Sequence, residues 1–346
     1  MRQAIQGDLA EVGPEASLDL TVVCPFYNEG QIIEEAISTL LARMERLEAS
    51  WELIVVDDGS TDGSGEIAAK LATRHPRLRT LSYRFNRGRG HALRTGIAQA
   101  CGAVIVTTEI DLSWGEDIVE RLYAAAGENP DADVIVASPH LPGGGYRNVP
   151  ASRVLYSRLG NLVIRACMSN AVTMNTGMTR AYRRDSIRSL PLAEDGKEFH
   201  LEVILKAQAL GYRIAEIPSL LEWKEYKHQG ERVTRKSSSR VKRLIITHSL
   251  FSLFGNPIRY VWVLGGVAFT LSAGFLAAGI IRYAMGLVSV YMGILSLALF
   301  LLGALLFAFG VIAQQNNMVQ RELWRLKQDL WRAEQKQHTP PTRPAT

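Results

Sequence analysis

Hydrophobic and polar positions in the first half of the chain alternate between two patterns. Short apolar runs end in polar residues, and after each run apolar residues recur every three or four positions over a longer stretch. The first pattern is typical of a buried strand and the second of an amphipathic helix. We expect strands at 18–24, 52–56, 78–83, 103–108 and 134–137, and helices at 31–47, 65–72, 90–100 and 116–126. This alternation predicts an α/β fold with a mostly parallel, Rossmann-like sheet covered by helices.

The last third of the chain carries two long stretches without charged residues. One lies between Arg259 and Arg282, and the other between Arg282 and Arg321. Each stretch can cross about 30 Å of hydrocarbon as a helix, which predicts a transmembrane hairpin. The expected spans are 260–281 and 288–312, within a hairpin at 258–313. Because basic residues flank both outer ends of the pair, we expect a multi-pass protein of the cell (plasma) membrane with both termini and the N-terminal domain in the cytosol.

Basic residues crowd the segment 224–243, enough to account for the whole formal net charge of +5. A basic run is often no more than a solvated linker. Here apolar residues alternate with basic ones toward the first expected span. We therefore expect a basic juxtamembrane segment at 226–257, with a helix that lies in the interface and contacts membrane lipid.

Beyond the second span, at 314–337, apolar residues recur at alternating spacings of four and three. They are Val319, Leu323, Leu326 and Leu330. The spacing predicts an amphipathic or coiled-coil helix, and association into a homo-oligomer or a position on the membrane surface fits it equally. We expect a flexible N-terminus at 1–17, without a secretory signal peptide, and a disordered tail at 338–346.

Polar side chains follow several expected strands, at the sheet edge where ligands bind in folds of this kind. Glu109 and Asp111 flank one residue, so in an extended segment both carboxylates point to the same side and could hold Mg²⁺ or Mn²⁺ against a diphosphate. Two such acids are also common in solvated turns. Asp57 and Asp58 end another strand, where one acid caps the next helix and the other is free to accept hydrogen bonds from a nucleotide.

The segment 86–91, NRGRGH, puts glycines and arginines just before a helix, a context suited to phosphate binding. It is neither a GxGxxG fingerprint nor a Walker A sequence, which argues against a dehydrogenase or a P-loop enzyme. Cys24, Cys101 and Cys167 stand far apart and form no CxxC pair. We therefore expect a reducing, cytosolic setting without a disulfide framework or zinc site. We also expect no nucleic-acid partner.

Together these motifs resemble glycosyltransferase family 2 of the GT-A fold, and within it the polyprenyl-phosphate glycosyltransferases, the group of dolichyl-phosphate mannose synthase. The motifs that carry the resemblance are CPFYNEG, VVDDGSTDG, NRGRGHALRTG, SRLGN and RAYRR. The resemblance covers 18–225, the expected catalytic domain. A two-span anchor also matches one branch of that group.

The resemblance implies roles for individual residues of this chain. Nucleotide binding would fall to Pro25, Tyr27, Glu29 and Asp57 or Asp58, diphosphate binding to Arg89, metal binding to Glu109 and Asp111, and phosphate contacts in catalysis to Arg158 and Arg180 beside Asp111. Two departures from the family pattern stand out. The usual Asp-x-Asp is here Glu109-x-Asp111, and the arginine often found after the next strand is absent from 137–140. Glutamate still offers oxygen ligands, so we expect metal use to survive with altered geometry.

The implied reaction is inverting transfer of a hexose or related sugar from a UDP- or GDP-sugar to a polyprenyl phosphate at the cytosolic membrane face, with Mg²⁺ or Mn²⁺ as cofactor. Two alternatives stay open. A non-catalytic membrane scaffold with a decayed nucleotide pocket would explain the Glu-x-Asp departure. A processive polysaccharide synthase would share the first half of the chain, although its QxxRW motif and further spans are not visible here.

Overall fold

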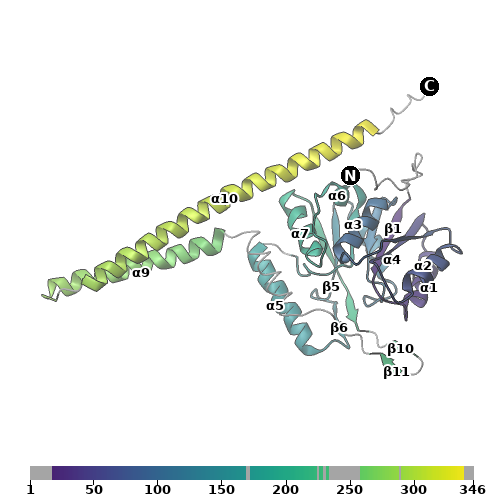
Figure 1. Cartoon of the computed structure of the whole chain (residues 1–346), viewed down its shortest axis with the longest axis horizontal. Helices are drawn as coiled ribbons and strands as arrows, with labels where there is room; N and C mark the ends of the chain where they lie inside the picture. Colours follow the sequence, from purple (N-terminus) through teal and green to yellow (C-terminus); the bar gives the residue numbers. More distant parts are fainter. Residues whose placement is uncertain are drawn as a thin grey trace. The chain divides into compact units, whose positions relative to one another are not determined.

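The computed structural model describes residues 18–168, 172–223, 226–228, 231–233, 258–287 and 290–338 (Figure 1). The chain divides into two compact units, one of Met1–Asn161 and Val172–Ser238 and the other of Leu162–Ala171 and Ser239–Thr346. The first unit contains the sheet predicted from the alternating pattern. The second contains two long apolar helices.

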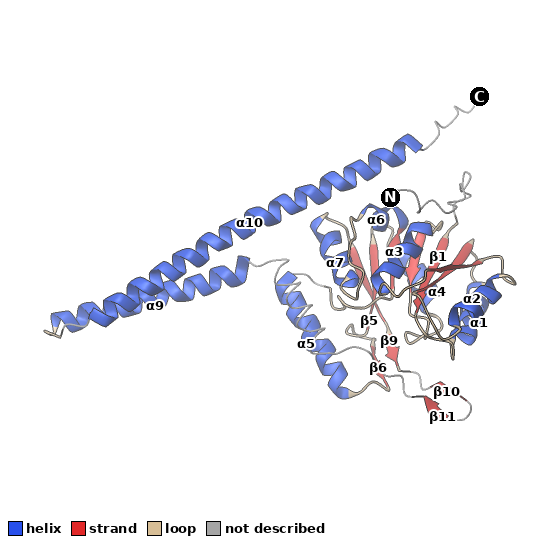
Figure 2. Cartoon of the chain, in the orientation of Figure 1, coloured by secondary structure: helices blue, strands red, loops and turns tan. Residues whose placement is uncertain are grey.

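A seven-stranded sheet in the order β3-β2-β1-β4-β7-β5-β8 forms the centre of the first unit (Figure 2). Its strands are β1 (Leu20–Phe26), β2 (Trp51–Asp57), β3 (Leu78–Ser82), β4 (Val104–Thr107), β5 (Val134–Ser138), β7 (Arg180–Arg183) and β8 (Ile214–Pro218). Neighbouring strands run parallel except at β7, which lies antiparallel between β4 and β5. The mostly parallel sheet is therefore confirmed, and β7 is an insertion that the alternating pattern did not predict.

Four helices follow the strands as the periodicity predicted, and they are α1 (Ile33–Met44), α2 (Ser64–Ala72), α3 (Arg89–Gln99) and α4 (Ile118–Glu128). The structure adds α5 (Ala151–Met168), α6 (Arg184–Ser189) and α7 (Phe199–Ala209). Helix α3 packs closely on β1 and β2 at Gly96. A Cβ at this position would collide with the side chain of Val23 and press on that of Val56. Two small sheets complete the unit, β6 (Gly145–Arg147) with β9 (Leu220–Glu222) and β10 (Tyr226–His228) with β11 (Glu231–Val233).

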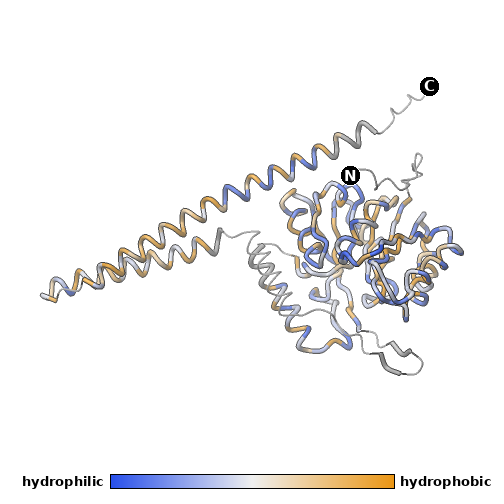
Figure 3. The backbone as a smooth tube through the Cα atoms, in the orientation of Figure 1, coloured by the Kyte–Doolittle hydropathy of each residue, from blue (hydrophilic) through white to orange (hydrophobic). Residues whose placement is uncertain are grey.

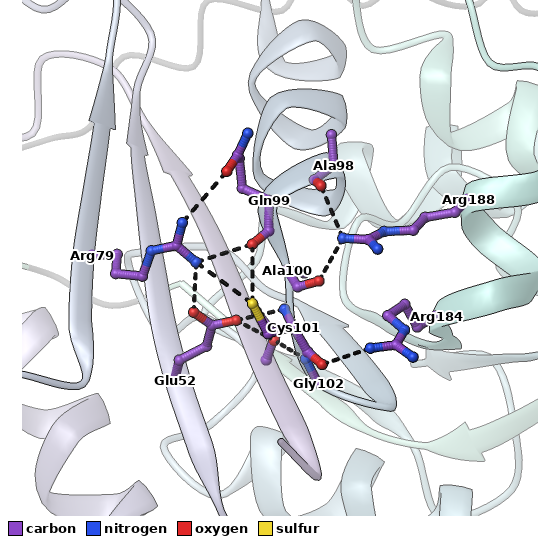
Figure 4. A network of polar contacts seen from close by, with 10 residues as sticks. Glu52, Arg79, Ala98, Gln99, Ala100, Cys101, Gly102, Arg184 and Arg188 are labelled. Carbon is purple, nitrogen blue, oxygen red and sulfur yellow. Dashed lines mark hydrogen bonds and ion pairs between the residues drawn. The ribbon is translucent and has the colours of Figure 1, made fainter. Parts of the chain in front are cut away.

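A polar network lies at the amino ends of β2 and β3 (Figure 4). The buried carboxylate of Glu52 accepts hydrogen bonds from the backbone N–H of Cys101 at 2.7 Å and from the guanidinium of Arg79 at 2.8 Å. Arg184 donates to the carbonyl of Cys101 at 2.8 Å, and Arg188 donates to carbonyls at the end of α3. Because these partners satisfy the buried charge, this edge has a structural role, and the chemistry predicted from the sequence lies at the opposite edge.

The second unit includes the end of α5 and an antiparallel hairpin of α9 (Ile258–Ala284) and α10 (Val290–His338). Trp262 stacks on Phe307 with ring centroids 5.7 Å apart, and Ser272 and Ser296 exchange hydrogen bonds farther along. Both helices are long and apolar enough to cross a membrane. Figure 3 shows apolar positions along α9 and the first part of α10, with polar ones toward the far end of α10.

The structure joins two expected elements into one helix and leaves others undescribed. The second expected span and the amphipathic helix at 314–337 are both parts of α10, because the polar junction at 313–317 contains neither glycine nor proline. The strands β10 and β11 lie in the expected juxtamembrane segment and group with the first unit. The expected interfacial helix, the N-terminus at 1–17 and the tail beyond His338 lie outside the described residues.

Candidate active site

The loops after β1 and β2 are joined by hydrogen bonds at the carboxyl edge of the sheet. The backbone N–H of Asn28 donates to the Ser60 hydroxyl at 3.0 Å, and the N–H of Thr61 donates to the Asn28 side-chain oxygen at 2.8 Å. The N–H of Gly30 donates to the Asp62 carboxylate at 2.8 Å. Asn28 has a φ of 54°, a left-handed conformation that asparagine adopts more readily than most residues. The two loops therefore form one continuous surface.

The residues predicted to bind a nucleotide occupy different positions on this surface. Tyr27 is 44% exposed and Glu29 is half-buried, so both side chains face the loop surface. Pro25 is buried near the end of β1, so its ring does not face the loop surface. Asp57 ends β2 and accepts a hydrogen bond from the backbone N–H of Ser60 at 2.8 Å, which makes it the acid that holds the turn.

Asp58 is not the free acceptor that the sequence suggested. Asp58 is 4% exposed, and its carboxylate accepts hydrogen bonds from the Tyr83 hydroxyl at 2.6 Å and the Asn86 side chain at 3.0 Å. The backbone N–H groups of Arg87 and Gly88 also donate to it, at 2.9 and 3.1 Å. Burial and then the bond to Asp58 raise the pKa of Tyr83, so its hydroxyl stays a donor. Asp58 thus organises the loop between β3 and α3.

Glu109 and Asp111 lie together after β4, as predicted, but in unlike surroundings. The Ser113 hydroxyl donates to Glu109 at 2.9 Å, and the Ser113 backbone N–H donates to Asp111 at 3.0 Å. The guanidinium of Arg89 lies 3.1 Å from the other oxygen of Glu109. Leu112, between Asp111 and Ser113, has a φ of 50°, a strained conformation for a leucine. Glu109 is thus paired with Arg89, the arginine to which the family resemblance assigns diphosphate binding.

This arrangement fits a metal that arrives with a diphosphate better than one held by protein alone. Within the described part of the chain, no group of three or more His, Cys, Asp or Glu side chains is arranged to hold a metal ion. The charge of Glu109 is already balanced in part by Arg89. Mg²⁺ typically binds through one or two carboxylates together with substrate phosphates. The half-buried carboxylate of Asp111 meets that requirement, with Glu109 beside it.

A lysine that sequence reasoning missed completes the cationic side of the site. Burial lowers the pKa of Lys197, and the charge of Arg89 lowers it further while that of Glu109 opposes the change. Lys197 thus lies within electrostatic reach of both members of the ion pair. The Gly-Lys step in the charged segment 194–198, EDGKE, was the available signal. Arg89 and Lys197 together can balance the charge of a diphosphate.

The loop that carries Lys197 is fastened to the start of α3. The carboxylate of Asp195 pairs with Arg94 and lies 3.3 Å from Nδ1 of His91, whose backbone N–H donates to the Asp195 carbonyl at 3.1 Å. A Cβ on Gly90 would lie 2.5 Å from the Glu194 carbonyl. The glycines of the NRGRGH segment therefore allow this close approach, in addition to any role in phosphate binding.

Arg180, for which the resemblance implies a phosphate contact, is enclosed by protein. Its side chain is fully buried, and its guanidinium donates to the carbonyls of His200 at 2.8 Å and Asn175 at 2.7 Å. Burial lowers the pKa of Arg180. A guanidinium enclosed in this way cannot reach a phosphate unless the chain around Asn175 and the start of α7 rearranges. These contacts fit a structural role, and the phosphate contact implied by the resemblance stays a prediction.

Arg158 is exposed on α5, as a phosphate-binding residue would be. Its charge acts on Tyr146, whose pKa is raised by burial and lowered by the bond to Ser157 and by Arg158. The Tyr146 hydroxyl lies 3.1 Å from the Ser157 hydroxyl and 3.2 Å from Nε2 of His140. Arg158 thus lies near the polar cluster of His140, Tyr146 and Ser157. The catalytic role predicted for Arg158 stays a prediction.

The sheet order and the acidic, cationic and loop residues at its carboxyl edge define a GT-A glycosyltransferase. The fold matches that of glucosyl-3-phosphoglycerate synthase from Mycobacterium tuberculosis, solved with Mn²⁺ and UDP, with a TM-score of 0.51 and 21% identity over 68% of this chain and 80% of that one. Residues 21–190 match the family model described as glycosyl transferase family 2. The chain belongs to this family.

Relatives within the family have named acceptors. An undecaprenyl-phosphate mannosyltransferase of Micrococcus luteus is 31% identical over 206 residues, which are 58% of this chain and 81% of the relative. An undecaprenyl-phosphate 4-deoxy-4-formamido-L-arabinose transferase of Salmonella paratyphi A is 29% identical over 252 residues, 72% of this chain and 71% of the relative. A dolichyl-phosphate beta-glucosyltransferase of Trichomonas vaginalis is 28% identical over 217 residues, 59% of this chain and 64% of the relative.

Proposed function

We propose that this glycosyltransferase moves a hexose or related sugar from a UDP- or GDP-sugar to a polyprenyl phosphate within a membrane. The observation that carries the proposal is the presence in one chain of a GT-A domain and two helices able to span a bilayer. A polyprenyl chain partitions into lipid because water disfavours its apolar surface. An enzyme that uses such an acceptor has to work at the membrane surface, and the three named relatives support the same acceptor class.

The charges around the hairpin support an orientation with the catalytic domain and both termini on the cytosolic face of the cell membrane. Arg259 stands at the start of α9, and Arg321 and Arg325 follow the apolar part of α10. Basic residues favour the cytosolic side of a span. The short linker between the helices would then lie on the opposite face.

We assign donor binding to the carboxyl edge of the sheet. Tyr27 offers a ring and Glu29 a carboxylate at the loop surface, which suits a nucleotide base and ribose. Arg89, which pairs with Glu109, and Lys197 would balance the charge of the diphosphate. Mg²⁺ or Mn²⁺, held by Asp111 with Glu109 beside it, would add positive charge on the leaving diphosphate.

The chemistry that these residues support is a direct displacement. An oxygen of the acceptor phosphate attacks the anomeric carbon, the bond from that carbon to the donor diphosphate breaks, and its electron pair leaves with the nucleoside diphosphate. The new bond forms on the opposite face, so the configuration inverts. A phosphate is already anionic at neutral pH, and the attack therefore needs no strong protein base. The contribution of the protein is positioning and stabilisation of the departing charge by Arg89 and Lys197.

The test is transfer of labelled sugar to solvent-extractable lipid by the purified full-length protein in liposomes that contain polyprenyl phosphate. A panel of UDP- and GDP-sugars is supplied with Mg²⁺ or Mn²⁺, with and without chelator, and the Asp111→Asn variant is assayed in parallel. We expect label in the lipid from one donor, lost with chelator and in the variant. No transfer from any donor by folded protein would overturn the proposal and favour the non-catalytic scaffold.

A further inference from the structure

Helix α9 packs against the first part of α10. Phe307 and Gly310 lie against Trp262, which is near the start of α9. Helix α10 continues beyond Gly310 to His338, a distance of about 40 Å at 1.5 Å per residue. This part of α10, residues 311–338, is called the α10 extension.

The α10 extension displays one apolar stripe. Val319, Leu323, Leu326 and Leu330 are 57%, 51%, 58% and 64% exposed. Their spacing of four, three and four places them on one side of the helix, at the inner a and d positions of a heptad repeat. Asn316 lies three residues before Val319, at an a position of the same stripe. A polar residue at one a position, among apolar ones, fixes the register of paired helices.

Charges beside the stripe favour a second copy of the same helix in the same direction. In this register Glu322 occupies a g position and Lys327 the following e position, which face each other across two parallel helices. The next such pair, Asp329 and Glu334, carries like charges. Attraction therefore lies nearer the membrane end of the extension and repulsion nearer its tip.

We propose that residues 316–330 of the α10 extension form a parallel coiled coil with the same segment of a second copy of this chain. All copies insert into the bilayer in one direction, so their extensions are already parallel. Fixing each extension to a membrane helix also confines the copies to a thin layer, which raises their effective concentration. A stripe too short to pair free helices in solution is sufficient under these conditions.

Disulfide formation between introduced cysteines tests the pairing in the full-length protein. The background carries Cys101→Ser and Cys167→Ser, while Cys24 is buried and stays. Leu326→Cys places a thiol on the stripe, and Arg321→Cys, also exposed, places one on the outer side of the same helix. Both proteins are reconstituted at low protein-to-lipid ratio and oxidised.

We expect a covalent dimer for Leu326→Cys at least about tenfold more abundant than for Arg321→Cys. Equal yields would mean random collision, and no dimer in either would mean no pairing; both results overturn the proposal. An environment-sensitive dye on the cysteine at position 326 distinguishes pairing of the helices from a position of the stripe on the membrane surface. Quenching of that dye by brominated lipid would place the stripe on the membrane surface, and would also overturn the proposal.

Discussion

The guanidinium of Arg89, at the start of α3, lies 3.1 Å from the carboxylate of Glu109, just after β4. This pair makes the two acids of the Glu-x-Asp segment unequal, because Glu109 already has a cationic partner. It also brings the arginine proposed to bind the diphosphate and the proposed metal-binding position to the same place. The residues proposed for catalysis therefore form one electrostatic unit, and several of its members can be tested separately.

Replacing Asp111 by Asn should reduce sugar transfer by about 100-fold or more, because the proposed metal loses its main carboxylate ligand. The melting temperature should stay within about 2 °C of wild type, since Asp111 is half-buried at a loop. Asp131→Asn, at an exposed surface pair with Arg213, is the control and should leave both quantities unchanged. Retention of full activity by Asp111→Asn contradicts the metal assignment.

Arg89→Ala should raise the KM for the nucleotide-sugar by about tenfold or more, because a charge-assisted contact to the diphosphate is lost. Arg89→Lys should restore part of the affinity, since lysine keeps the charge without the planar fork. The exposed Arg74→Ala is a control for loss of surface charge. A donor KM equal to wild type in Arg89→Ala would assign this arginine to structure alone.

Asp58→Ala should lower the free energy of unfolding by about 3 kcal/mol, because the Tyr83 hydroxyl and two backbone N–H groups lose a buried acceptor. Chemical denaturation measures the change, and hydrogen exchange should increase at 83–88. If stability and exchange match wild type while nucleotide binding is lost, then Asp58 contacts the nucleotide directly as the family resemblance implied.

Arg180→Met should destabilise the fold by about 2–4 kcal/mol, because the carbonyls of Asn175 and His200 lose their donor. The surviving folded protein should keep the wild-type KM for donor and acceptor. Arg213→Met, an exposed arginine, is the control and should cost no more than about 0.5 kcal/mol. A large rise in either KM with unchanged stability would restore the predicted phosphate contact.

The lowered pKa of Lys197 predicts an alkaline limit to activity. A lysine with a lowered pKa loses its proton at a lower pH than usual, so its attraction for the diphosphate is present at neutral pH and fades as pH rises through that pKa. A profile of kcat/KM against pH should therefore fall on the alkaline side. Lys197→Arg should move that fall to higher pH, because a guanidinium stays charged. An identical profile in the variant would exclude Lys197 as its cause.

Local pattern alone was enough to predict much of this fold. Strand and helix periodicities located β1 to β5 and their helices, and the uncharged stretches located α9 and the apolar part of α10. The strand-end position of Glu109 and Asp111 also followed from the sequence, because the carboxyl ends of parallel strands meet at one edge. These features depend on neighbours within a few residues or on a general rule of sheet topology.

The identity of the partners was decided by the tertiary structure. Asp58 meets Tyr83, the loop that carries Lys197 packs on the start of α3, and Arg180 is enclosed by the chain around Asn175 and His200. A single sequence gives the chemical type of such residues but not their burial, because the antiparallel insertion of β7 and the packing of the loops onto α3 bring distant segments together. Hydrogen bonding and desolvation act through space, and they determine which charged groups hold the fold and which are left for a substrate.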